Sequence, residues 1–148
     1  MWASKAGGFT LVELLVVMVL IGLLSGLIFT SVGSGILKSE EKRFINDFIQ
    51  GLNRARAASL GRGTAVRFVI DGNERTFYLD AKKKKKIPEG VQIEGEGISE
   101  FGENKFGIIF FPDASSSGGE IDLKLEDGQI ERVTISRLLG IITSRRES

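Results

Sequence analysis

Glu13 is a single carboxylate in an otherwise apolar stretch near the N-terminus, KAGGFTLVELLVVMVLIGLL, which runs from Lys5 to Leu24. A lone carboxylate near the centre of a lipid bilayer costs about 2.5 to 3.5 kcal/mol, so such a residue usually has a partner or a function. If the chain is cut between Gly8 and Phe9, the new α-amino group of Phe9 is a cation about one helical turn from Glu13. The expected chemistry is therefore an ion pair, either within one chain or between two chains.

The residue types needed for most catalytic and metal chemistry are missing from the sequence. The chain has no His and no Cys, which excludes disulfides, the common zinc and haem ligands and the usual general base. No nucleotide-binding glycine loop follows a predicted strand, and the carboxylates lack the spacing of a metal site. We therefore expect no enzyme, no cofactor and no metal.

The overall charge is balanced, because 20 Lys and Arg face 19 Asp and Glu in a chain of 148 residues. This balance argues against a protein whose whole surface binds nucleic acid, so any basic site must be local. A chain of this length is normally one domain. We expect one small globular head after the apolar N-terminal segment.

The element that must position Glu13 is a long helix. The run from Leu14 to Leu37 contains 24 residues without a charge, more than the ~20 residues that cross a bilayer core. It predicts a transmembrane helix in contact with membrane lipid. The alternative is a cleaved secretory signal, but its apolar region would be only about 7 to 15 residues long.

An amphipathic pattern follows the apolar run and predicts that the same helix continues from about Thr10 to Leu60. Apolar residues recur at steps of three and four while charged residues take most other positions. Gly61 and Gly63 are natural stop signals. The apolar positions on the predicted dry face are Phe44, Ile45, Phe48, Ile49, Leu52 and Ala55.

From Thr64 the periodicity is that of β-strands. TAVRFVI and RTFYLD flank an Asp-Gly turn signal at 71–72 and predict a hairpin, and a second Asp-Gly follows at 127–128. Further strands are expected in GVQIEGEG, KFGIIFF, EIDLKLEDG and QIERVTIS, with Ile121, Leu123 and Leu125 on one face. Because the long helix precedes all the strands, the fold class is α+β, with the helix packed on a mostly antiparallel β-sheet or sandwich.

Two basic groups are candidates for a local anion site. Five adjacent lysines, Lys82, Lys83, Lys84, Lys85 and Lys86, lie between two predicted strands, and Arg145 and Arg146 lie near the C-terminus. Adjacent lysines repel each other and cannot share one face, so a solvated loop tip is the expected structure. The functional alternative is a contact for an anion such as nucleic acid or an acidic partner.

The N-terminal stretch resembles that of type IV pilins and of the pseudopilins of type II secretion. It has a short basic leader that ends in glycine, an aromatic first mature residue, a glutamate at the fifth mature position and a long apolar helix. The resemblance implies that prepilin peptidase cuts between Gly8 and Phe9 and methylates the Phe9 amine. It also implies that Glu13 neutralises the Phe9 amine of a neighbouring subunit during filament assembly.

The head resembles that of the minor pseudopilin type called GspH and of the related minor pilin type called FimT. The resemblance rests on IPEGVQI, residues 87–93, and on FFPDASSSGGEIDL, residues 110–123, where an aromatic-Pro segment leads through a small polar loop into a strand. Ala114 departs from the family, which commonly has glycine there. The plain alternative for ASSSGG is a flexible hairpin loop rather than a recognition surface.

These expectations divide the chain into a leader, residues 1–8, a transmembrane half-helix, residues 9–37, an amphipathic periplasmic half-helix, residues 38–62, and a β-rich head, residues 63–148. The expected function is that of a minor pseudopilin of a type II secretion system, anchored once in the inner membrane with its head in the periplasm. Its expected partners are other pseudopilins or pilins, prepilin peptidase and the inner-membrane assembly platform, and nucleic acid is not expected.

One alternative is a FimT-like minor pilin of a type IV pilus, with contact to DNA as an added option because such pilins carry late arginines. The Gly-x-Arg pattern of those DNA-uptake pilins is absent from GIITSRRES. The other alternative is an ordinary single-span protein with a binding head.

Overall fold

The structure is a computed structural model that describes residues 9–147, except for the side chains of residues 24–37. The chain forms two compact units, Met1–Ser39 and Glu40–Ser148. The second unit is the head of the molecule. The predicted leader, residues 1–8, lies outside the described residues.

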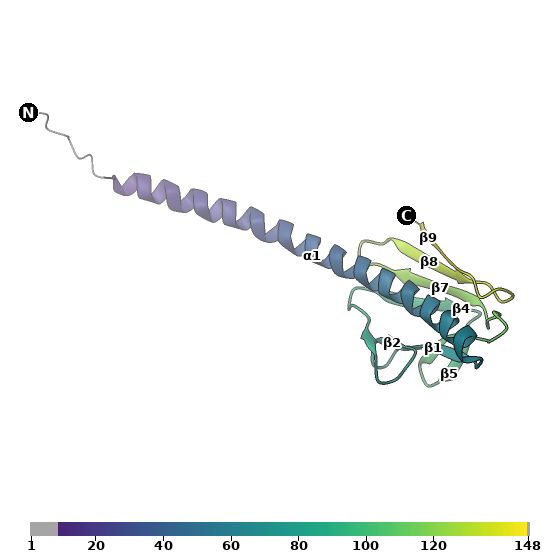
Figure 1. Cartoon of the computed structure of the whole chain (residues 1–148). Helices are drawn as coiled ribbons and strands as arrows, with labels where there is room; N and C mark the ends of the chain where they lie inside the picture. The colour runs from purple at the N-terminus through teal and green to yellow at the C-terminus, as the bar shows by residue number, and fades with distance from the viewer. Residues whose placement is uncertain (1–8, 148) are drawn as a thin grey trace, which may run out of the picture. The chain divides into compact units, whose positions relative to one another are not determined.

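One long helix, α1, runs from Leu11 to Arg62 and confirms the predicted N-terminal helix (Figure 1). It ends two residues later than expected. The N–H of Gly63 donates to the carbonyl of Ser59 at 3.0 Å, and Gly63 has a φ of 65°. A left-handed residue directly after the last turn is a common way to satisfy the final carbonyls of a helix, and glycine adopts that conformation without strain.

The part of α1 that belongs to the head is amphipathic, as the sequence predicts. The side chains of Phe48, Leu52 and Ala55 are fully buried, and those of Phe44 and Ile45 are nearly so. Ile49, the sixth predicted position, is partly buried against the same core. The helical periodicity therefore identified the face of α1 that covers the sheets.

Within residues 9–147, nine strands follow the helix, and every pairing between them is antiparallel. They are β1 (Val66–Asp71), β2 (Thr76–Tyr78), β3 (Lys85–Lys86), β4 (Gln92–Glu96), β5 (Ser99–Gly102), β6 (Lys105–Phe110), β7 (Gly119–Lys124), β8 (Ile130–Ile135) and β9 (Ile142–Glu147). They form a five-stranded sheet in the order β3-β2-β1-β6-β5 and a four-stranded sheet in the order β4-β7-β8-β9. The predicted α+β class is confirmed.

Both predicted Asp-Gly hairpins are present. β1 pairs with β2 across the first turn, and β7 pairs with β8 across the second. Asp71 stabilises the first turn, because its Oδ1 accepts the N–H groups of Asn73 and Glu74 at 3.1 Å each and its Oδ2 lies 3.1 Å from the Lys105 Nζ. The hydrogen bond from Glu74 and the nearby Lys105 ammonium lower the pKa of this buried carboxyl.

A single hydrophobic core joins the head portion of α1 to both sheets. Its centre is a group of four aromatic rings, each in contact with at least two of the others at centroid separations between 5.0 and 5.8 Å, formed by Phe44, Phe48, Phe68 and Phe77. The four-stranded sheet contributes Ile121, Leu123 and Val133, all fully buried. Ile121, Leu123 and Leu125 are all buried, as their predicted common face requires. Burial of these side chains is the main stabilising term for the head.

The predicted transmembrane half of α1 is described only in part. Among the residues that the structure describes, no helical segment has both the length and the mean hydropathy needed to span a membrane. The helical backbone of this region is confirmed, and its transmembrane character stays a prediction.

Candidate assembly site

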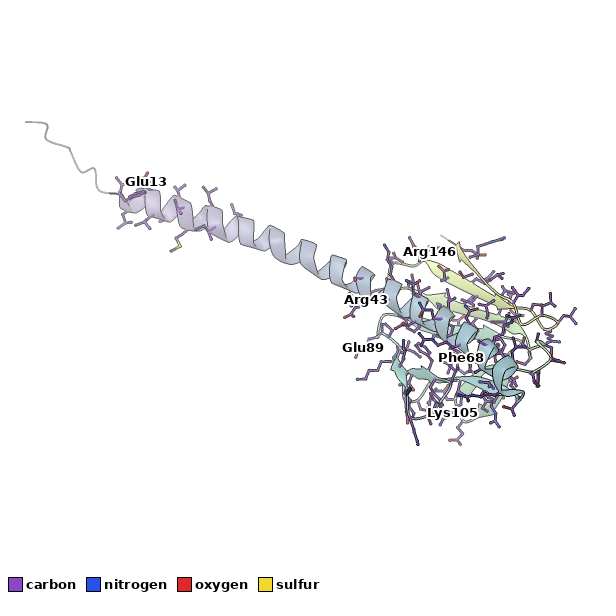
Figure 2. All side chains as sticks on the ribbon, in the orientation of Figure 1. Glu13, Arg43, Phe68, Glu89, Lys105 and Arg146 are labelled. Carbon is purple, nitrogen blue, oxygen red and sulfur yellow. The ribbon has the colours of Figure 1, made fainter. Side chains whose placement is uncertain are left out.

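Glu13 lies in the first turn of α1, close to the start of the helix (Figure 2). The N–H of Glu13 donates to the Thr10 Oγ1 at 3.3 Å and to the Thr10 carbonyl at 3.1 Å. Thr10 is therefore the N-cap, and Thr10-x-x-Glu13 has the spacing of a capping box. The cap fixes the start of the helix directly after Phe9, so the residue that would become the mature N-terminus is one turn from the carboxylate.

No cation within residues 9–147 forms an ion pair with the Glu13 carboxylate. Gly8, the other residue of the predicted cleavage site, lies outside the described residues. A carboxylate at the N-terminal end of a helix is already favoured by the helix dipole. The site can therefore accept a cation from outside the described residues or from another molecule.

The start of α1 is apolar on all sides and exposed. Phe9 is 77% exposed, Leu11 80% and Met18 67%. A helix that is hydrophobic all round normally lies inside a larger assembly or a membrane, because exposed apolar surface costs about 25 cal/mol per Å². This surface therefore requires a partner that the described residues do not supply.

The polar segment ASSSGG crosses from β6 to β7, which lie in different sheets. The segment therefore does not join two paired strands, but its first part folds back as an antiparallel turn, in which Phe110 is bridged to Ser116 and the Phe111 N–H donates to the Ser115 carbonyl at 2.9 Å. The N–H and Oγ of Ser115 donate to Asp113 Oδ1 at 3.0 and 2.5 Å, which lowers the pKa of Asp113, and Ser116 Oγ donates to the Ser136 carbonyl at 2.9 Å. The hydroxyls of Ser115 and Ser116 stabilise the crossing itself.

Ala114 has a φ of 73° within this crossing. The left-handed region costs a residue with a Cβ roughly 1 to 2 kcal/mol, whereas glycine adopts it freely. The backbone thus keeps the geometry that the family's usual glycine would favour, although this chain has alanine.

The lysine run divides between a turn and an edge strand. Lys85–Lys86 form β3 at the edge of the five-stranded sheet, so the expected loop tip is wrong for these two residues. Lys84 forms an ion pair with Glu74, and the Lys85 Nζ lies 2.9 Å from Asp47 Oδ1. Part of the charge of the run is therefore neutralised, and its role as an anion contact stays a prediction.

The late arginines lie in β9, at the edge of the four-stranded sheet. Arg146 Nε is 3.0 Å from Glu131 Oε2, and Arg145 lies opposite Arg132 in the register of β8 and β9. Arg132 is itself paired with Asp122 through two hydrogen bonds of 2.8 and 2.9 Å. The last two lysines of the run and the late arginines therefore occupy edge strands of two different sheets.

Two comparisons with known proteins found a match, one to the N-terminal segment and one along nearly the whole chain. Residues 3–29 match the family described as "Prokaryotic N-terminal methylation motif". Over 139 residues, 93% of this chain, the sequence is 27% identical to the type II secretion system protein H of Xanthomonas campestris pv. campestris, of which 82% is covered. The two matches support a type IV pilin-like pseudopilin of the GspH type. No solved structure matches the chain.

The pseudopilin family is structural, and its members assemble with other pilin-like subunits. Within the described residues, no group of three or more acidic side chains could hold a metal ion.

Two features of the chain were missed by reasoning from the sequence. The Thr10 cap is one, although the pattern Thr-x-x-Glu before an apolar run is its usual signal. The other is the turn between β8 and β9, which exposes Leu138 and Leu139. The sequence signal for this turn is the pair Leu138-Leu139 directly before Gly140. The turn was not recognised because β9, the strand that follows it, had not been predicted.

Proposed function

We propose that the chain is a minor pseudopilin subunit that adds to a short periplasmic filament of a type II secretion system. The observation that carries this proposal is the exposed apolar start of α1, with Glu13 one turn from Phe9 inside the segment that matches the methylation motif. Similarity to protein H along 93% of the chain favours a secretion filament over other pilin-like assemblies. The function is assembly and not catalysis.

Prepilin peptidase removes residues 1–8 by cutting between Gly8 and Phe9 and then methylates the new amine. The amine becomes the cation that the Glu13 carboxylate lacks within the described residues. Phe9 lies directly before the Thr10 cap, so cleavage there removes no part of α1. Processing therefore creates the charge needed for assembly without unfolding the helix.

Residues 9–37 hold the subunit in the inner membrane, in contact with membrane lipid, and the head lies in the periplasm. Before assembly, the Glu13 carboxylate is in apolar surroundings at a cost of about 2.5 to 3.5 kcal/mol if it is unpaired. Pairing with the Phe9 amine of a neighbouring subunit removes this cost. The ion pair therefore favours entry into the filament and fixes the axial register of adjacent helices.

The partners are other pseudopilins or pilins, through the apolar surface of α1, together with the inner-membrane assembly platform that lifts the subunit. Helix association in a membrane depends on close packing and on satisfied polar groups rather than on the hydrophobic effect. Exposed aliphatic side chains on every side of residues 11–20 suit packing among several neighbouring helices.

A FimT-like minor pilin of a type IV pilus is the alternative from the sequence. The structure gives it less support, because two lysines of the run are in ion pairs and the late arginines lie on a different sheet. Nucleic acid is therefore not among the proposed partners.

Deletion of the gene in the host bacterium tests the proposal. Proteins exported by the type II system should accumulate in the periplasm, and the full chain supplied in trans should restore their release. Glu40, an exposed carboxylate farther along α1, provides the matched control, because Glu40→Gln should complement fully whereas Glu13→Leu should not. Normal export in the deletion strain, with loss of a pilus-dependent trait, would favour the type IV pilus instead.

A further inference from the structure

A groove of about 410 Å³ lies between the head portion of α1 and the segment that begins in β2 (Figure 1). Five residues of α1 form one wall, and they share one face of the helix because they recur at steps of three and four. They are Asp47, Gly51, Arg54, Ala58 and Arg62. The other wall consists of residues 77–80, Lys83 and Lys85. A space of this volume is large enough for a few residues of a peptide.

The floor of the groove is apolar. Phe77 is buried beneath it, and Ala58 and Leu79 are partly buried against the same core. Gly51 contributes no side chain to fill the groove beside Phe77, where a Cβ would lie 3.5 Å from the Phe77 Cε2. Apolar surface in a groove is stabilised when an apolar group covers it and excludes water. The floor therefore favours an apolar side chain of a ligand.

The rim of the groove carries more positive than negative charge. Lys85 is already paired, because its Nζ lies 2.9 Å from Asp47 Oδ1. Arg54, Arg62 and Lys83 are exposed, and within residues 9–147 none of them forms an ion pair with a carboxylate. Cations that share a groove repel one another, and an anion placed between them offsets that repulsion. The rim therefore favours a ligand with carboxylates.

Two carboxylates in the groove limit the kind of anion that fits. Asp47 and Asp80 both line it, and Asp80 is held in the turn before β3 because its Oδ1 accepts the Lys82 N–H at 3.0 Å. They repel a ligand that is negative along its whole length, such as nucleic acid. A peptide whose carboxylates are separated by uncharged residues can avoid both of them. The mixed charge therefore favours an acidic peptide over a polyanion.

The two arginines set the spacing of the ligand's carboxylates. Arg54 and Arg62 are eight residues apart in α1, which is a rise of about 12 Å at about 1.5 Å per residue. An extended peptide covers about 12 Å in roughly four residues, at about 3.3 Å each. Ala58 lies midway between the arginines and lines the groove with them. The matching ligand therefore has two carboxylates about four positions apart, with an apolar residue midway between them.

We propose that this groove binds an extended acidic segment of another protein, in which two carboxylates flank an apolar side chain. The carboxylates pair with Arg54 and Arg62, the apolar side chain covers the floor, and Lys83 adds a third cation. The lysine run thus acts with arginines of α1 and not with the late arginines of β9. The inference goes beyond the proposed function, because the groove lies wholly within the head and its binding does not depend on N-terminal processing.

Fluorescence anisotropy of a labelled peptide, titrated with the full chain in zwitterionic lipid nanodiscs, tests the proposal. The probe is an alanine-based peptide with blocked ends, a central phenylalanine and one glutamate two positions to each side of it. A second probe has glutamine in place of both glutamates. The acidic probe should bind roughly tenfold more tightly than the neutral one, because only its carboxylates pair with the rim.

Substitutions at single arginines locate the binding site. Arg54→Gln and Arg62→Gln should each weaken binding of the acidic probe about fivefold, and both side chains are exposed, so the head should keep its fold. Arg43→Gln is the matched control, because it removes the same charge from an exposed position of the same helix outside the groove (Figure 2). It should leave the affinity unchanged. The double variant Arg54→Glu with Arg62→Glu should instead prefer a probe with lysines in place of the glutamates.

Four results would overturn the proposal. Two are equal affinity for the acidic and neutral probes, and equal weakening by Arg43→Gln and Arg54→Gln. The third is tighter binding of duplex DNA or of anionic vesicles than of the acidic probe, lost in the Arg54→Gln variant, because the occupant would then be nucleic acid or lipid. The fourth is self-association of the full chain in zwitterionic detergent that Arg54→Gln abolishes, because the groove would then hold a second copy.

Discussion

Among single residues, Glu13 matters most for assembly: its carboxylate has no ion-pair partner among the described residues, and Thr10 fixes its position at the start of the helix. If the carboxylate pairs with the amine of another subunit, removal of its charge affects assembly and not folding. Glu13→Leu should leave processing and membrane insertion intact or improve insertion, because an apolar residue replaces a costly charge. Incorporation into the filament, measured by cross-linking to the major pseudopilin, should fall at least tenfold, on the order of 1.4 kcal/mol.

Glu13→Asp is the matched variant, because it keeps the charge on a shorter side chain. It should retain part of the incorporation that Glu13→Leu loses. Normal incorporation of Glu13→Leu would show that the carboxylate has no role in assembly.

Ala114 offers a test of backbone strain at a single position. Ala114→Gly should raise the free energy of unfolding by about 0.5 kcal/mol, because relief of roughly 1 to 2 kcal/mol of left-handed strain exceeds the entropic cost of glycine in the unfolded chain. The control is Ala65→Gly, at an exposed alanine that is not among the positive-φ residues, and it should be slightly destabilising. The midpoint of urea denaturation is measured for both variants and for the unaltered chain. A midpoint for Ala114→Gly below that of the unaltered chain would show that the backbone at Ala114 is not strained.

For the elements, α1 provides a paired test of packing against helix propensity. Gly51 faces the core, and a Cβ there would lie 2.7 Å from the Phe68 Cε2, whereas a Cβ at Gly61 would have no neighbour within 4 Å. Overpacking outweighs the gain in propensity at the first site, so Gly51→Ala should lower the free energy of unfolding by about 1 kcal/mol. Gly61→Ala should raise it by about 0.5 kcal/mol, because only the propensity changes.

Thermal unfolding of the two variants gives opposite shifts of Tm if the helix packs on the sheets as described. A rise in Tm for both variants would mean that Gly51 does not face Phe68.

The long helix and the strongest strands could be predicted because their signals are local. Phe44, Phe48 and Leu52 recur at helical spacing, and the two Asp-Gly turns lie between β-rich runs. β3, β5 and β9 were not predicted, since they are short or polar and owe their pairing to a neighbouring strand. β9 shows this well: Thr143 to Arg146 are all exposed, so no alternation of apolar and polar residues marks it as a strand.

Part of the candidate site could be predicted from the sequence, and part of the surface of the head could not. The spacing of Gly8, Phe9 and Glu13 is local in the sequence, so it predicts the cleavage position and the carboxylate one helical turn away without knowledge of the fold. The backbone of the turn between β8 and β9 depends on contacts across the fold, such as that between Arg56 and the Leu139 carbonyl, 83 residues apart. Local residue spacing does not predict such long-range contacts.

For the whole molecule, the distribution of charge decides between the secretion filament and a DNA-uptake pilus. Binding that uses the lysine run with Arg145 and Arg146 should weaken steeply with salt, because each neutralised phosphate releases counterions. We expect weak binding or none near physiological salt, since two of the lysines are in ion pairs and the arginines lie on the other sheet. Titration of the head fragment, residues 40–148, against duplex DNA measures this affinity. Micromolar binding that is abolished when Lys82, Lys83 and Lys86 are changed to Ser would favour the DNA-uptake pilin.

The central claim is that this chain becomes an assembly subunit through processing at its N-terminus. Mass spectrometry of the chain from the membrane fraction of a strain with prepilin peptidase tests that claim most directly, with a strain lacking the peptidase as control. The account predicts a mature chain that begins at methylated Phe9 in the first strain and an unprocessed chain that retains Met1 in the second. A chain that retains Met1 in both strains would contradict the account.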